Sequence, residues 1–153
     1  MLRLGLILVL LAGCGGPVAH VSSQQSAAIA STQNSSINSY RRAAGLRPLT
    51  QSARLDAIAA RHANDMSRNG FFSHVGSNGS TVGQRARARG YDYCRISENI
   101  AKGQKSRDEV MRDWYARDSH RTNMLHDDIR EYGMARAEGN VWVMVMGRSG
   151  CRG

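Results

Sequence analysis

The clearest hydrophobic pattern in the chain begins after Thr50. Apolar side chains then recur three or four residues apart, as they do on one face of an α-helix, at Leu55, Ile58, Ala59, Ala63 and Met66. We predict a helix that Thr50 caps and that ends at Gly70, since glycine commonly follows the last residue of a helix. His62 lies on the same apolar stripe, which favours a hydrogen-bonded histidine of the core over a ligand.

Shorter helices are expected on both sides of this one. Residues 37–44 form the end of a helix that stops at Gly45, and residues 81–89 form a basic helix. Another begins at Ser106, in the Ser-Arg-Asp-Glu pattern of a capping box, with Glu109 reaching back to the N-cap. A last one follows, capped by Asp118 or Ser119 and running to Leu125.

The C-terminal part has the two-residue period of a β-strand. Val141, Val143 and Val145 alternate with Trp142, Met144 and Met146, so both faces are apolar and the strand is central. The turn Glu138-Gly139-Asn140 folds it back on residues 132–137 as a hairpin. Helices followed by a strand pair, with a further extended piece at residues 96–100, predict an α+β fold built in layers.

The sequence Arg-Ile-Ser-Glu-Asn-Ile-Ala at residues 95–101 leaves two interpretations open. If it is extended, Ile96, Glu98 and Ile100 share one face, and an inward carboxylate is costly unless it is paired. If it is helical, Ile96 and Ile100 stack one turn apart and Glu98 points elsewhere. The groups that Glu98 meets would decide its role.

The N-terminus has the pattern of an export signal. A basic start and an apolar run lead to Leu-Ala-Gly-Cys at residues 11–14, which resembles a bacterial lipobox. That resemblance implies a lipid on Cys14; the alternative is an ordinary signal peptide whose cleavage removes this residue. We therefore expect a signal peptide at residues 1–13, a flexible tether at 14–32 and one folded domain at 33–153.

Beyond Cys14, the sequence holds two cysteines, Cys94 and Cys151. In an exported protein two cysteines more often pair than stay free, so we expect a disulfide, with two free thiols as the alternative. The bridge would close a loop of roughly 58 residues, which the loop-entropy model values at about 4 kcal/mol.

The formal net charge is +9, and only Lys102 and Lys105 among the 21 basic residues are lysines. A basic patch can bind nucleic acid, but the export signal and the lack of aromatic residues interleaved with basic ones argue against that partner. An acidic envelope surface, anionic lipid or plain solubility explains the charge better.

Three separated residues are the candidates for chemistry: His74 in a turn-rich loop, Glu98, and His120 in Asp-Ser-His-Arg-Thr-Asn-Met-Leu. Two imidazoles and one carboxylate can hold a zinc ion with an open fourth position, or can perform acid–base catalysis. Each also has a structural alternative, in which His74 and Glu98 brace loops and His120 hydrogen-bonds backbone carbonyls.

Several segments together resemble the CAP superfamily of cysteine-rich secretory, antigen 5 and pathogenesis-related proteins, in its short bacterial form. They include INSYRRAAGLRPL (37–49), FFSHVGSNGST (71–81), SENIAKGQ (97–104) and WYARDSHRTNML (114–125). The resemblance implies an α-β-α sandwich with a central, mostly antiparallel sheet and a cleft that gathers two histidines and two glutamates. His74, Glu98 and His120 match three of these positions, whereas Arg117 stands where the fourth, a glutamate, is expected.

These features lead to a first hypothesis of an envelope protein, anchored to the membrane by lipid, whose cleft binds a lipid, a divalent metal or a cell-wall component. A metal-assisted hydrolase or peptidase using His74, Glu98 and His120 is the alternative, although the sequence offers no evident nucleophile. In a third interpretation the polar cluster only braces the fold.

Overall fold

A computed structural model describes residues 36–150, whose strands form one mixed sheet. The strands are β1 (Thr50–Gln51), β2 (Tyr93–Lys102), β3 (Glu131–Ala137) and β4 (Val141–Ser149). They lie in the order β1-β3-β4-β2; β1 runs parallel to β3, and the other neighbours are antiparallel. Strand β2 is therefore at an edge of the sheet, where loops and helices can reach it.

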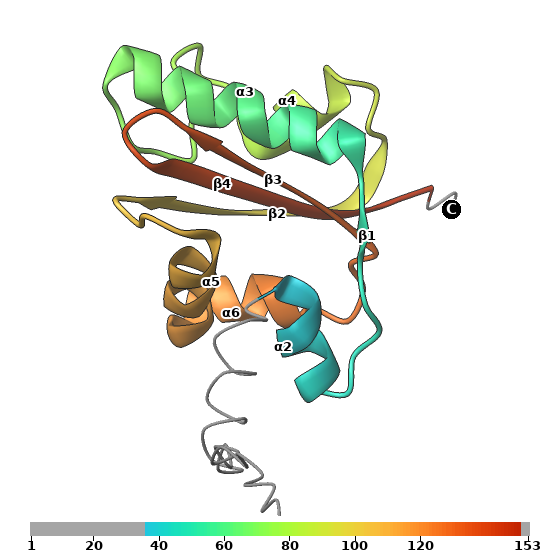
Figure 1. The fold of residues 1–153 in the computed structure, drawn as a ribbon. Coiled ribbons are helices and arrows are strands. Elements are labelled where there is room, and N and C mark those ends of the chain that lie inside the picture. The colour runs from blue at the N-terminus through green and yellow to red at the C-terminus, as the bar shows by residue number, and fades with distance from the viewer. Residues whose placement is uncertain (1–35, 151–153) are drawn as a thin grey trace, which may run out of the picture.

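Helices cover both faces of this sheet. They are α2 (Ile37–Ala43), α3 (Ala53–Asn69), α4 (Val82–Arg87), α5 (Arg107–Ala116) and α6 (Asp118–Leu125). Figure 1 shows α3 and α4 on one side of the sheet and α2, α5 and α6 on the other. The α+β class and the α-β-α sandwich expected from the sequence are confirmed.

Strand β4 is buried on both faces, as its alternation predicts. Val141, Val143 and Val145 belong to the apolar cluster that includes the buried side of α3. Trp142, Met144 and Met146 belong to the opposite cluster, with Val110, Met111 and Trp114 of α5. Gly139 and Asn140 both adopt positive φ, at 74° and 56°, and close the predicted hairpin tightly.

Some helix starts differ from the sequence prediction. Ser52, not Thr50, caps α3, because Thr50 is already paired with Glu131 in the short strand β1. Neither Asp118 nor Ser119 caps α6; the N-cap position is Arg117, which makes no side-chain capping bond.

The predicted start of α5 at Ser106 is confirmed, since its hydroxyl accepts from the Glu109 backbone N–H. The return bond is shifted, however. The Glu109 carboxylate accepts from the backbone N–H of Lys105 at 2.8 Å, one residue before the predicted partner.

A buried arginine fixes the layer that carries α6. Arg41 of α2 is fully buried and donates from Nη1 to the carbonyl oxygens of Met124 and His126, each at 2.9 Å. Its Nε donates to the carbonyl of Arg47, also at 2.9 Å. A cation at the C-terminal end of a helix is favourable, because the carbonyls there carry partial negative charge. Arg41 thereby sets the position of α6.

Several sequence predictions fall on residues outside the described range. The signal peptide, the lipidated Cys14, the tether and Cys151 are among them, so the anchor and the Cys94–Cys151 disulfide stay predictions. Among residues 36–150, no helix combines the length and the apolar character that crossing a membrane requires.

Candidate functional site

The segment at residues 95–101 is extended and lies in the edge strand β2. Ile96 and Ile100 pack in the apolar cluster below α3, and Glu98 between them points to the same face of the sheet. Its cross-strand neighbour on β4 is Val145. Glu98 is only 6% exposed. The extended interpretation is confirmed, and the carboxylate is turned inward.

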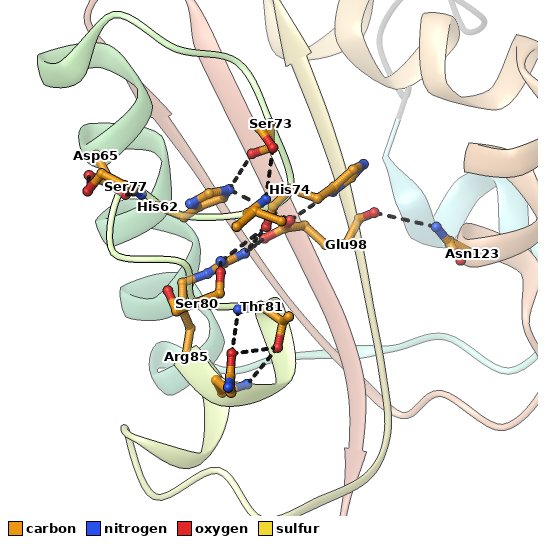
Figure 2. Close-up of polar contacts among 12 residues, drawn as sticks. His62, Asp65, Ser73, His74, Ser77, Ser80, Thr81, Arg85, Glu98 and Asn123 are labelled. Carbon is orange, nitrogen blue, oxygen red and sulfur yellow. Dashed lines mark hydrogen bonds and ion pairs between the residues drawn. The ribbon is translucent and has the colours of Figure 1, made fainter.

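The buried Glu98 carboxylate is compensated by a guanidinium and an imidazole (Figure 2). Arg85 of α4 donates from Nη2 to Oε2 at 2.7 Å, and Nδ1 of His74 lies 2.9 Å from Oε1. His62 Nε2 is farther away, at 3.8 Å from Oε1. A buried carboxylate with an ion pair and hydrogen bonds is tolerated, whereas an isolated one is not.

Arg85 also fixes the loop that carries His74. Its guanidinium donates to the His74 carbonyl at 3.2 Å from each of Nη1 and Nη2, and to the Ser80 carbonyl at 2.6 Å. Farther along the loop, Asp65 of α3 accepts from the Ser77 backbone N–H and hydroxyl, at 2.9 and 2.6 Å. The His74 ring is 56% exposed, so its Nδ1 is held by Glu98 while the rest faces outward.

His62 is the core histidine that the sequence predicts. It is fully buried on α3, and its Nε2 lies 2.9 Å from the carbonyl oxygen of Ser73. The geometry suits an Nε2–H that donates to this carbonyl. Burial lowers the pKa of His62, the carboxylate of Glu98 opposes that shift, and Arg85 adds to it. His62 supports the loop from beneath.

His120 comes from the opposite helical layer and is joined to β2 through amides. Asn99 donates to the His120 carbonyl at 3.1 Å, and Asn123 donates to Oδ1 of Asn99 at 2.9 Å. Burial lowers the pKa of the His120 imidazole, and the positive charges of Arg117 and His74 lower it further. Its Nδ1 is buried and has no hydrogen-bond partner among the described residues.

The two predicted imidazoles, but not the predicted carboxylate, line one cavity. Its volume is about 540 Å³, and its wall includes His74 from the loop, His120 from α6, and the end of β2. Other residues of this wall are Phe72, Lys102, Gln104, Asp113, Trp114 and Arg117. Glu98 lies behind His74 and is not part of the wall. It is therefore a positioning residue for His74.

The zinc hypothesis fits this arrangement poorly. Within residues 36–150, no group of three or more His, Cys, Asp or Glu side chains could hold a metal ion. Both Glu98 oxygens are engaged, by His74 and Arg85. A metal-bound histidine normally donates its second N–H to an acceptor, and the buried Nδ1 of His120 has none in the described part of the chain.

Sequence reasoning missed Arg85, which compensates Glu98 and fixes the His74 loop. The only signal was the basic character of the segment at residues 81–89, which is equally typical of a solvated surface. Arg117 was noticed as a departure from the glutamate expected there, and it lines the cavity next to His120.

A family model described as the cysteine-rich secretory protein family, CAP, matches residues 35–146. The chain is also 31% identical over 106 residues to the uncharacterized protein YkwD of Bacillus subtilis (strain 168). That alignment covers 69% of this chain but 41% of YkwD, so the chain spans less than half the length of this relative.

Two solved structures share the fold. An extracellular protein containing an SCP domain from Bacillus anthracis str. Ames has a TM-score of 0.72 at 22% identity, over 88% of this chain and 45% of that one. An outer surface protein from Borrelia burgdorferi has a TM-score of 0.69 at 20% identity, over 85% of this chain and 97% of that one. At such identities these likenesses establish the fold.

Proposed function

This chain belongs to the CAP family, and on that premise we propose that it is an exported, lipid-anchored protein of the bacterial envelope that binds a small ligand between His74 and His120. The observation that carries the ligand proposal is the cavity of about 540 Å³ that both imidazoles line. Its size falls within the range of small-molecule sites, about 300–1,000 Å³. Glu98 holds the His74 ring, and Asn99 donates to the backbone carbonyl of His120, so that neighbouring residues of β2 position the two histidines.

Export and anchoring are supported by the N-terminal sequence and by the descriptions of two similar proteins. The N-terminal residues have the order of a lipoprotein signal that ends at Cys14. The two solved relatives are described as an extracellular protein and an outer surface protein. A cleft ligand would then be a lipid or a cell-wall component, as the family resemblance implies.

A hydrolase is the second candidate, and one observation favours it. The Glu98 carboxylate orients His74 through Nδ1, as a carboxylate orients the general base of a catalytic triad. The Nε2 of His74 would then be the atom that accepts a proton from water. We rank this activity lower because its metal-assisted form needs Glu98 as a metal ligand or as the base, and Glu98 is engaged by Arg85 and lies outside the cavity wall.

Two measurements test the proposal. Native mass spectrometry of the protein isolated from envelope fractions should detect a bound small molecule on the wild type, with about tenfold lower occupancy in His74→Ala/His120→Ala. Equal occupancy in both proteins, or none in the wild type, would contradict ligand binding in this cavity. Lipid labelling and membrane association should both be lost in Cys14→Ser; retention of both would refute the anchor.

A further inference from the structure

The cavity between His74 and His120 has an excess of positive charge on its wall. Lys102 and Arg117 are basic residues of this wall, whereas Asp113 is its one acidic residue. Glu98 does not alter this balance, because it lies behind the wall and is already paired with Arg85. The charge of the cavity therefore suits a ligand of negative charge.

Arg117 is the residue most available to such a ligand. It ends α5 and its backbone N–H donates to the carbonyl of Trp114, which fixes the main chain at this point. Among residues 36–150, the Arg117 guanidinium forms no ion pair or hydrogen bond, and the residue is exposed. A guanidinium presents paired N–H donors that match the two oxygens of a carboxylate or phosphate.

His120 lines the cavity, and the burial of one of its ring nitrogens bears on which nitrogen can donate a hydrogen bond. Its Nδ1 is shielded from solvent and has no partner in the described part of the chain. A proton on Nδ1 would be a buried N–H without an acceptor, which is costly, so the proton of the neutral ring resides on Nε2. That tautomer offers an N–H to an anion, whereas a metal ion would need a lone pair on the same nitrogen.

Two further wall residues suit a hydroxylated ligand with a ring. Asp113 accepts one hydrogen bond, from Nε2 of Gln104 at 2.8 Å, and its carboxylate has capacity for a further donor such as a hydroxyl group. Phe72 is 48% exposed at the cavity and is one of the exposed large apolar side chains of the described residues. Its ring can pack against the apolar face of a sugar.

We infer that this cavity binds the anion of an acidic saccharide. Its carboxylate lies against Arg117 and the Nε2–H of His120, and one of its hydroxyl groups donates to Asp113. This inference rests on the proposed function, since it names the class of ligand that the same cavity takes. It follows from Arg117, which reverses the charge that a glutamate would place there.

The test compares two sugars that differ by one acidic group. N-acetylmuramic acid carries a carboxylate that N-acetylglucosamine lacks, and the imidazole resonances of His74 and His120 report binding to the purified full-length protein by NMR. We expect N-acetylmuramic acid to bind about tenfold more tightly than N-acetylglucosamine. Inorganic phosphate serves as a third probe, which shows whether a bare anion suffices.

Variants then locate the acidic group. Arg117→Gln should reduce the affinity for N-acetylmuramic acid about fivefold or more, and Lys102→Gln should reduce it less. Arg112→Gln is the matched control, because Arg112 is exposed on the same helix but is not part of the cavity wall. It should bind like the wild type.

The outcomes separate this inference from the proposed function. If both sugars shift His74 and His120 equally and Arg117→Gln changes nothing, the cavity binds sugar but the inference about charge is wrong. If no probe shifts either imidazole resonance, the acidic-saccharide inference is wrong. A ligand detected by mass spectrometry would in that case still support the proposed function, in which the cavity binds a small molecule. If phosphate binds more strongly than N-acetylmuramic acid, the ligand class is a small anion and the inference of an acidic saccharide is wrong.

Discussion

Arg85 Nη2 lies 2.7 Å from Oε2 of Glu98, and this ion pair joins the short helix α4 to the edge strand β2. The pair is buried, with side-chain exposures of 9% for Arg85 and 2% for Glu98. It also determines where His74 lies, because both residues contact it. The position of His74 in the cavity wall therefore depends on the Arg85–Glu98 ion pair, although Glu98 is not part of that wall.

Removal of one partner of this pair should destabilise the protein strongly. Arg85→Met leaves the buried Glu98 with an imidazole alone, and breaking a buried ion pair in this way costs about 3–5 kcal/mol. Arg85→Met/Glu98→Leu should recover part of that loss, because no buried charge remains without a partner. Urea unfolding measures each value, with the exposed Arg112→Met as control. A loss in Arg85→Met no greater than in the control would contradict this account.

Stability should fall as the pH is lowered through the range in which free histidine titrates. Burial lowers the pKa of both His62 and His120 in the folded protein. As the pH falls through about 6.5, the unfolded chain therefore takes up protons that the folded protein does not, and unfolding becomes easier. The free energy of unfolding should therefore increase with pH from the lowered pKa values of His62 and His120 up to about pH 7.

A single substitution tests the contribution of His120. In His120→Gln the dependence of the unfolding free energy on pH should be shallower than in the wild type, because one of the two titrating groups is gone. Urea unfolding across this pH range provides the comparison. An unchanged slope would show that His120 titrates alike in the folded and unfolded states.

Arg41 should contribute much more to stability than its neighbour on the same helix. It is fully buried and donates to three backbone carbonyls, whereas Arg42 is exposed. Hydrogen bonds of charged groups contribute about 1.5–3 kcal/mol each, so Arg41→Met should lose about 3 kcal/mol or more and Arg42→Met almost nothing. Thermal and urea unfolding can decide this. Similar values for the two variants would refute the role given to Arg41.

The predicted disulfide can be tested independently of the cleft. If Cys94 and Cys151 pair, mass spectrometry of peptides from the unreduced protein should recover them joined. Cys94→Ala/Cys151→Ala should then lower the free energy of unfolding by about 2–5 kcal/mol. Quantitative alkylation of both cysteines in the unreduced, unfolded protein would disprove the bridge.

The elements with a strong period were predictable, and the shortest ones were not. The alternation of β4 predicted a strand buried on both sides, because each face carries only apolar residues from Val141 to Met146. Strand β1, at two residues, is too short to show any period, and it displaced the expected cap from Thr50 to Ser52.

The site was predicted only in part, for reasons of topology. His74 and His120 do share a cavity, as the family resemblance implied. Glu98 is separated from it because its side chain points toward α3 and α4, whereas His120 comes from the layer on the other face of the sheet. Arg85 could not be recognised as its partner, since that contact depends on how α4 packs beside β2.

Calorimetric titration with zinc tests the central claim most directly, because it distinguishes a ligand cavity from a metal site. Glu98 is engaged by Arg85 and His74, and His120 lacks an acceptor for Nδ1 among the described residues. We therefore predict no saturable binding at micromolar zinc, with identical traces for the wild type and for His74→Ala/His120→Ala. Stoichiometric zinc binding that the double substitution abolishes would contradict the account.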